Sequence, residues 1–403
     1  MMSCKKKIQT DRKVSTDLAD LSSLGDENQD TKSTDLCFPQ DTCGLNVCLK
    51  DQTDLADLSS LEDENQDTDP YHFTSDQSKV HSDEVEGPLI GDHETQESEG
   101  GEADLHKHFV NCEKNPGHSQ FIPVDTFSLK HLPEGLQDND LYEYIKLTAD
   151  LTVRVGVEMS SPYRPKFWPE TTQPYPFSNI SERRNLRTGS GSVRNVNKFQ
   201  DELRQDGGFR DTDYTKCWCR KCEASNSPSN VWWEFQVYTA THVVFDNIEA
   251  NHTNLRLFYD RDGSPKISVD KVSVRSVNIE DDLCWLKCVT CDKTLGNKLM
   301  EMWKHSVNVW RKVFDKYSES IFKHKFLFIV SHPHGCSKQV SVGQWKDKLN
   351  VGYNSKFTYT TCTCPGSSGA YVQCLGYNDY LTWSNLVHSG SKSGLNYSGV
   401  GRV

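Results

Sequence analysis

The chain has 403 residues and a formal net charge of −12 at pH 7, which is long enough for two domains or for one large domain with a tail. Residues 14–110 contain 25 Asp and Glu and four lysines, which gives this region a charge of −21. The other residues of the chain therefore carry a net charge of −12 − (−21) = +9. No basic stretch interleaved with aromatic residues indicates nucleic-acid binding, and no window of about 18 apolar residues indicates a membrane span.

The first residues lack the pattern of a secretory signal peptide. The lysines at positions 5–7 form a basic cluster, but polar residues follow where a signal peptide has its apolar core. We therefore expect a cytoplasmic protein. In that reducing compartment its 15 cysteines would be buried thiols or metal ligands rather than disulfides.

The acidic region contains a two-copy repeat. Residues 16–30 recur as residues 53–67, and both copies contain Thr-Asp-Leu-Ala-Asp-Leu-Ser-Ser-Leu. Two copies are too few to bury the core of a solenoid array, and many like charges with few aromatics are typical of disorder. Residues 1–120 are therefore predicted to be an acidic disordered region. The leucines of the repeat could also fold as a short helix on a protein partner.

Residues 121–187 are richer in aromatic and aliphatic side chains. Their spacing predicts a helix over residues 138–151, N-capped by Asp138 or Asp140. The residues on its apolar side would be Leu141, Tyr144, Ile145 and Leu147. The Pro-rich residues 161–176 are predicted to be extended and to wrap a surface.

From residue 188 to residue 403 the pattern changes to short β-branched or aromatic segments separated by turns, which favours an all-β barrel or sandwich. Strands are predicted at 192–193, 231–238, 255–259, 267–269, 272–274, 326–330 and 371–374. Residues 299–317 differ, because their apolar side chains recur with helical periodicity. This helix would be an insertion or the connection between two barrels, and its apolar side is interpreted as core packing.

Three short motifs stand in an informative order. His242 follows a predicted strand, Asp282 precedes an alternating apolar run, and Ser368 lies in the glycine-flanked turn Gly366-Ser367-Ser368-Gly369. Each motif alone is more often a loop or a strand end. Together they give a base, an orienting acid and a nucleophile in the chain order His, Asp, Ser.

These motifs resemble the trypsin-like serine protease superfamily over residues 188–403. The segments 188–192 and 331–343 are similar to the high-temperature-requirement type, which has no processed N-terminus. The resemblance implies an all-β fold of two six-stranded antiparallel barrels of the chymotrypsin type, here with a helical insertion. It also implies that His242 is the general base, that Asp282 orients it and that Ser368 is the nucleophile.

The resemblance further implies an oxyanion hole and a specificity pocket. The backbone N–H groups of Gly366 and Ser368 would form the oxyanion hole. The pocket would involve Cys362, six residues before the nucleophile, together with Ser389 and Gly390. An uncharged Cys362 at the floor would disfavour Arg or Lys at the cleavage site. Ser367 stands where trypsin-type enzymes have Asp, so activation by cleavage of a zymogen N-terminus is not expected.

The cysteines support a separate hypothesis. Cys219 with Cys222 and Cys288 with Cys291 each show the Cys-x-x-Cys spacing of zinc ligands, so a four-thiolate site across the first barrel is one interpretation. The alternative is that they are buried thiols or disulfide-bonded cysteines of strands. We favour the alternative and expect neither a bound metal nor another cofactor.

The sequence thus predicts a serine endopeptidase that hydrolyses peptide bonds of a protein or peptide substrate through an acyl-enzyme. A second hypothesis is an inactive protease-fold protein that serves as a binding or scaffold module. A third is a zinc-stabilised interaction domain in which the likeness to a triad is accidental.

Overall fold

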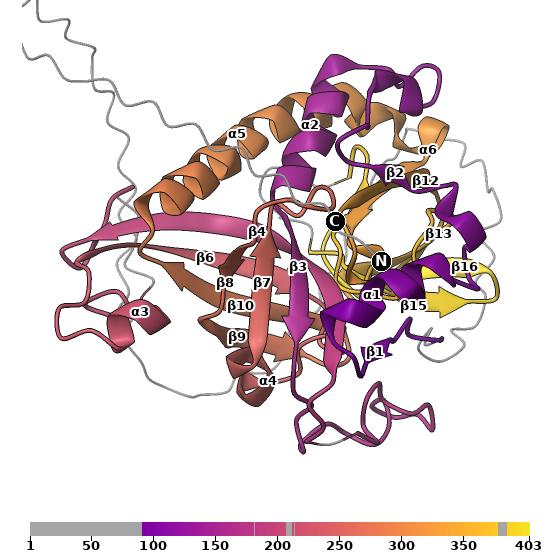
Figure 1. Cartoon of the computed structure of the whole chain (residues 1–403). Helices are drawn as coiled ribbons and strands as arrows, with labels where there is room; N and C mark the ends of the chain where they lie inside the picture. Colours follow the sequence, from indigo (N-terminus) through magenta and orange to yellow (C-terminus); the bar gives the residue numbers. More distant parts are fainter. Residues whose placement is uncertain (1–90, 181, 207–211, 213, 378–384) are drawn as a thin grey trace, which may run out of the picture. The chain divides into compact units, whose positions relative to one another are not determined.

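Two antiparallel β-sheets dominate the structure, a computed structural model that describes residues 91–403 apart from 181, 207–211, 213 and 378–384 (Figure 1). The two-copy repeat lies outside the described residues. Among the described residues every strand pairing is antiparallel. The all-β, chymotrypsin-like fold predicted from the sequence is therefore confirmed.

The first sheet has the order β8-β7-β3-β4-β6-β10-β9, with β1 and β5 paired to β4. Its edge strands β8 and β9 are separated in the chain by only two residues, Asp270 and Lys271, so the sheet curves until its edges meet. The strands are β1 (Glu97–Ser98), β3 (Thr152–Val157), β4 (Leu186–Gln200), β5 (Leu203–Arg204), β6 (Val231–Thr239), β7 (Thr253–Leu257), β8 (Ile267–Val269), β9 (Val272–Asn278) and β10 (Leu283–Thr290).

The second sheet has the order β14-β11-β12-β13-β16-β15, with β2 paired to β12. A bridge between Tyr371 and Val387 joins the starts of β14 and β15, which brings the two edges of this sheet together. The strands are β2 (Ile122–Pro123), β11 (Phe326–Ser331), β12 (Gln339–Val351), β13 (Asn354–Tyr359), β14 (Val372–Cys374), β15 (His388–Lys392) and β16 (Leu395–Ser398). The main path of this sheet has the six strands that were predicted, whereas the main path of the first sheet has seven.

Helices connect and cover the sheets. The α-helices are α1 (Glu102–Val110), α2 (Asn139–Asp150), α3 (Arg220–Glu223), α4 (Asn247–Asn251), α5 (Lys293–Tyr317) and α6 (Ile321–His324). Short 3-10 turns are η1 (Pro116–His118), η2 (Leu129–His131), η3 (Ser318–Ser320) and η4 (Pro333–Gly335). None of the helices in the described part of the chain is long and apolar enough to cross a membrane.

Both predicted helices are confirmed. Helix α2 begins after Asp138, whose side chain accepts a hydrogen bond from Leu141 N–H, and all four residues of its predicted apolar side are buried. Helix α5 connects β10 of the first sheet to β11 of the second. Figure 1 shows α2 beside α5, and residues of both helices share one apolar cluster with β11.

Two predictions about the segments before β4 are wrong. Disorder was predicted up to residue 120, but β1, α1 and η1 lie within residues 97–118. These elements are held by long-range contacts, because Glu102 pairs with buried Arg154 and Leu105 is buried. The Pro-rich residues are not simply extended: Trp168 and Tyr175 are buried, and a bridge between Phe167 and Pro174 closes a loop on itself.

The first turn of α5 rests on the first sheet at a glycine. Gly296 is buried, and a Cβ added there would lie 2.2 Å from the ring of Trp233 on β6. Trp233 is itself 1% exposed and cannot move outward. The close approach of helix and sheet therefore depends on the missing side chain.

Gly296→Ala should destabilise the protein by about 1–3 kcal/mol because the methyl group overpacks this contact. An alanine in a helix is otherwise about 1 kcal/mol better than glycine, so the sign of the change is diagnostic. The measurement is urea unfolding, with the exposed neighbour Asn297→Ala as the control. An unchanged or increased stability of Gly296→Ala would contradict the packing described.

Candidate active site

A buried histidine–aspartate pair lies at the end of β6 and the start of β10. His242 Nδ1 is 2.7 Å from Asp282 Oδ2, and the backbone N–H of His242 donates to Asp282 Oδ1 at 3.0 Å. Ser389 Oγ donates to Asp282 Oδ2 at 2.6 Å. The carboxylate thus holds His242 by one backbone and one ring contact, and the ring contact keeps the proton on Nδ1 and leaves Nε2 as the basic nitrogen.

The environment keeps Asp282 ionised. Burial by itself would raise the pKa of Asp282. His242 lowers it through its charge and through its hydrogen bond, and His93 and Ser389 add smaller effects, so that the pKa falls below its ordinary value. Asp282 has a positive φ of 52°, a backbone conformation that Asp tolerates better than most residues. This conformation lets the side chain face His242 directly before β10 begins.

Ser368 is fixed where the two sheets meet. Its carbonyl accepts a hydrogen bond from Ser190 N–H on β4, and the next residue, Gly369, donates to His388 O on β15. Gly369 has a φ of +81°, and a Cβ there would lie 2.1 Å from Thr239 Oγ1. Only glycine therefore fits after the serine, and both sheets determine its position.

Ser368 Oγ and His242 Nε2 are two of the unpartnered polar atoms of this region. Both are buried, and neither has a hydrogen-bond partner among the described residues. The structure thus brings His242 and Asp282 into contact and leaves the serine hydroxyl and the basic nitrogen without a mutual hydrogen bond. In enzymes generally, catalytic hydrogen bonds are often long in the unliganded state and tighten when a ligand binds.

The predicted oxyanion-hole residues lie on the same turn. Gly366 has a φ of +91°, and a Cβ there would lie 2.5 Å from His332 O. Ser190 Oγ donates to the Gly366 carbonyl at 2.8 Å. The N–H groups of Gly366 and Ser368 have no hydrogen-bond partner among the described residues, so they are free to donate to an oxyanion.

The three predicted pocket residues have different surroundings. Cys362 is buried, and its thiol donates to Asn115 Oδ1 at 2.8 Å. Ser389 turns its hydroxyl to Asp282 rather than to a pocket. A Cβ on Gly390 would lie 2.6 Å from the carbonyl oxygen of Asp92, because the N-terminal segment runs along this strand.

That segment is the part of the site that the sequence did not reveal. Asp92 pairs with Ser391 of β15 through two backbone hydrogen bonds of 2.8 and 2.9 Å. The His93 ring lies 4.7 Å from the ring of His242, and its Nδ1–H donates to Ser389 O at 2.8 Å. Burial, together with the charge of His242, lowers the pKa of His93 to about 3, so it is neutral. No motif or spacing links residue 93 to residue 242, and the acidic composition around it is typical of disorder.

Four cysteines meet beside the first sheet, but they are not the four predicted. Sulfur atoms of Cys217, Cys219, Cys222 and Cys291 all lie within 4.8 Å of one another, and those of Cys219 and Cys291 are 3.5 Å apart. Cys288 does not belong to this group of cysteines, because its side chain lies in the apolar core of the first sheet together with Cys284. Cys291 follows the end of β10 and is free to turn outward.

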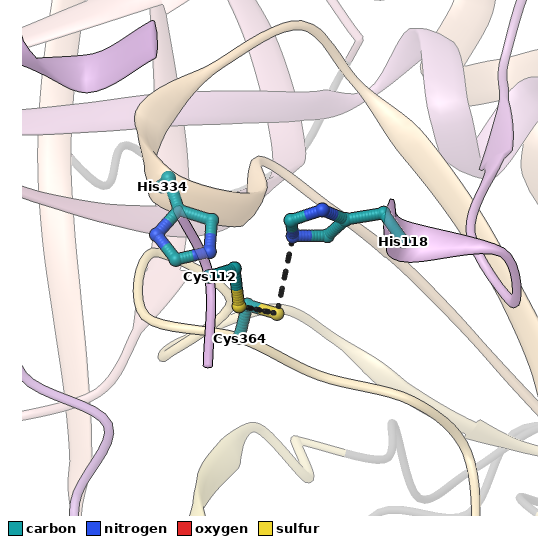
Figure 2. A group of neighbouring side chains, drawn as sticks. All are labelled: Cys112, His118, His334 and Cys364. Atoms are coloured by element: carbon teal, nitrogen blue, oxygen red, sulfur yellow. Dashed lines mark hydrogen bonds between the residues drawn. The ribbon is translucent and has the colours of Figure 1, made fainter. Parts of the chain in front are cut away.

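A second group combines two cysteines with two histidines. The possible ligand atoms of Cys112, His118, His334 and Cys364 lie within 4.8 Å of one another, and all four residues are buried. Figure 2 shows their side chains pointing into one shared space. His334 and His118 come from different short turns, so no local spacing could have indicated this group.

Together, the two sheets and the buried His–Asp pair at their junction define a chymotrypsin-like β fold. The chain matches no family model and no curated protein sequence. Among solved structures it is similar to the HtrA-type protease AlgW with a tripeptide, with TM-score 0.31 and 11% identity over 64% of this chain and 58% of that chain. It is also similar to the inactive form of the Rv3671c protease, with TM-score 0.29 and 10% identity over 65% of this chain and 90% of that chain. The chain therefore spans less than two thirds of AlgW, and similarity this distant concerns the fold alone.

A buried ion pair contacts the backbone carbonyl of His242. Arg164 of the Pro-rich loop binds Glu249 of α4 through two bonds of 2.7 and 2.8 Å, and it also donates to His242 O at 3.0 Å. Arg187 lies 3.2 Å from the same carboxylate. Burial would raise the pKa of Glu249, but the hydrogen bond and charge of Arg164, followed by the charge of Arg187, lower it from 4.5 to about 2.

Glu249→Gln should therefore destabilise the protein near neutral pH by about 3 kcal/mol, since two buried guanidinium groups lose their counter-charge. A lowered carboxyl pKa gives stability that is complete above the unfolded value of 4.5 and is lost as the pH falls toward 2. The difference between wild type and Glu249→Gln should consequently shrink between about pH 5 and about pH 3. Urea unfolding measures it, with exposed Glu158→Gln as the control. A difference independent of pH would rule out the ionised pair.

Proposed function

We propose that the protein is a serine endopeptidase acting on a protein or peptide substrate. The observation that supports this most strongly is the double contact of Asp282 with His242, which engages Nδ1 and leaves Nε2 as the available base. Nε2 of His242 is buried and has no partner among the described residues, as is also true of Nε2 of His93, His332 and His334, so the contact with Asp282 is what distinguishes His242.

The proposed reaction follows from these positions. His242 Nε2 takes the proton of the Ser368 hydroxyl as the oxygen attacks the substrate carbonyl, and it returns that proton to the leaving amine. Asp282 stabilises the imidazolium that forms. The N–H groups of Gly366 and Ser368 bind the oxyanion, each contributing on the order of 3 kcal/mol to the transition state. Water then repeats the sequence on the acyl-enzyme.

An inactive scaffold protein is the second candidate function. The observation in its favour is that residues 91–94 already lie along β15, where a substrate strand would bind, while no hydrogen bond joins Ser368 to His242. A scaffold would keep this segment permanently in place and would have no activated serine.

A fluorescent fluorophosphonate decides between the two. We expect it to label the wild-type chain and to fail with Ser368→Ala and with His242→Ala, because labelling requires a serine activated by its base. Ser227→Ala is the control, since it removes an exposed hydroxyl outside the catalytic turn and should still be labelled. A folded wild type that is not labelled would favour the scaffold.

A further inference from the structure

The segment before β1 is bound as a peptide strand beside the catalytic residues. Asp92 exchanges two backbone hydrogen bonds with Ser391, so residues 91–93 extend the edge of β15 in the antiparallel sense. Ser389 of the same strand holds Asp282. Addition of a strand to a sheet edge is a general way for proteins to bind extended peptides. Gly390 allows this approach, because a Cβ there would meet Asp92 O.

The next residue places a carboxylate in a closed polar pocket. The Glu94 side chain is only 5% exposed. It forms an ion pair with Lys114, and its Oε1 accepts a hydrogen bond from Thr363 Oγ1 at 3.0 Å. Lys114 is fixed in turn by Thr363 Oγ1 at 3.1 Å and by Asn396 Oδ1 at 3.0 Å. Cation and hydroxyl together complement a carboxylate.

His388 completes this pocket from β15. Its Nε2 lies 3.4 Å from Glu94 Oε2, and its Nδ1 lies 2.7 Å from Tyr359 Oη. A phenol donates its proton to the ring nitrogen, so Nδ1 accepts and Nε2 carries the hydrogen that faces the carboxylate. Both side chains are fully buried. The orientation of the histidine is thus fixed before any ligand binds.

We propose, on the basis of the serine protease function above, that this pocket selects glutamate on the acyl side of the cleaved bond. The first substrate is the chain itself, at Glu94–Thr95. Asp92 and His93 would then be the two preceding residues, bound along β15 and against His242. Lys114 is C-terminal to the cleaved bond and therefore remains in the protease fragment. The pocket residues are thus all retained after cleavage, and the pocket can accept other glutamyl peptides.

The reaction balances as an ordinary hydrolysis. Ser368 Oγ bonds to the carbonyl carbon of Glu94 while its proton goes to His242 Nε2. The C–N bond to Thr95 breaks as its nitrogen receives that proton. Water, deprotonated by His242, then releases Glu94 as a free carboxylate and restores the serine. Thr95 is exposed, so the amine product leaves toward solvent. Its N–H donates to His93 O at 2.8 Å, and this one hydrogen bond must open for the attack.

The self-cleavage test uses the full chain and intact-mass measurement. Wild type should give a fragment ending at Glu94 and one beginning at Thr95, and Ser368→Ala should remain whole. Glu94→Gln should slow the cleavage about thirtyfold or more, since it leaves Lys114 without its charge partner. Glu99→Gln, an exposed glutamate of the same segment, is the control. Cleavage elsewhere, or at an equal rate in Glu94→Gln, would overturn the proposal.

Short peptides test the pocket separately. Hydrolysis of Asp-His-Glu-Thr peptides should exceed that of Gln and Lys counterparts, and Lys114→Met should reduce the glutamyl kcat/KM about thirtyfold or more. Exposed Lys107→Met on α1 is the control. Fluorophosphonate labelling without any preference for glutamate would overturn this inference and leave the protease function standing. No labelling and no hydrolysis of any peptide would overturn both.

An independent observation points to a metal site formed by the four residues of Figure 2. Cys112 Sγ and Cys364 Sγ are 3.6 Å apart, and Cys364 Sγ is 3.5 Å from His118 Nε2. Tetrahedral zinc with bonds of about 2.0–2.3 Å separates its ligand atoms by about 3.3–3.8 Å. The sulfur atoms are thus too far apart for a disulfide of about 2.05 Å and at the spacing of zinc ligands.

His334, the fourth residue of the group, has a ring nitrogen available to bind a metal. His334 Nε2 is buried and has no partner among the described residues. Its Nδ1 is 2.6 Å from Gln96 Oε1, so the amide oxygen accepts the Nδ1 proton and Nε2 is left as the electron donor. A hydrogen bond to the second ring nitrogen is the usual support of a metal-binding histidine.

We infer that Cys112, His118, His334 and Cys364 bind Zn²⁺. Cys364 is four residues before Ser368, whereas Cys112 and His118 flank the loop that carries Lys114. The metal would therefore tie the catalytic turn to the segment that lines the glutamate pocket. The group of Cys217, Cys219, Cys222 and Cys291 would bind a second zinc ion and fasten the loop before β6 to the end of β10.

Metal analysis of the purified full chain tests these sites without relying on activity. We expect two zinc ions per chain, one of which is lost in Cys112→Ser and the other in Cys219→Ser. Cys336→Ser, outside both groups, should retain two. Cobalt substitution of wild type avoids variants that fail to fold, since two-sulfur and four-sulfur sites differ in visible absorption. Wild type with one zinc ion that Cys219→Ser removes, or with none, would overturn the Cys112–Cys364 site.

Discussion

The tight junction between the two sheets is the constraint on which the candidate site depends. Gly369 lies so close to Thr239 and to Ser190 O that a single additional carbon would collide with both. Gly189 on β4 is equally confined, with Ser368 O 3.0 Å from where its Cβ would be. Small residues therefore let a turn of the second sheet reach the first. The proposed site, with Ser368 on this turn and His242 after β6, depends on that approach.

Once the sheets are joined, buried polar groups fix the details. Asp282 sits between His242 and Ser389, which come from different sheets, so its carboxylate also fastens the junction. Arg164 extends this network to the loop before β4 through Glu249 and the His242 carbonyl. Ionised groups are stable at such depth only when every charge has a partner with good geometry. These contacts hold Asp282 and Glu249 each between several partners.

The N-terminal segment gives the site its proposed selectivity. Its residues bring both an anion, Glu94, and the cation that receives it, Lys114, to a pocket whose other walls come from the second sheet. The same segment supplies two of the four ligands of the proposed zinc site. An enzyme organised in this way would couple its own processing, its specificity and its metal content through one stretch of chain.

The sequence by itself determined the elements whose signals are local. The cap at Asp138 and the apolar side of α2 follow from spacing within one helix, and strands such as β8 follow from their β-branched residues. The order of His242, Asp282 and Ser368 also indicated the fold. Tertiary structure alone decided the rest, because it joins residues with no fixed separation. His93 meets His242, Lys114 meets Glu94 and Thr363, and Cys217 takes the place predicted for Cys288. The acidic composition around residue 93 indicated disorder because composition measures the average tendency to stay in water. A few side chains that find buried partners of opposite charge outweigh that average, and those partners exist only after the two sheets have formed.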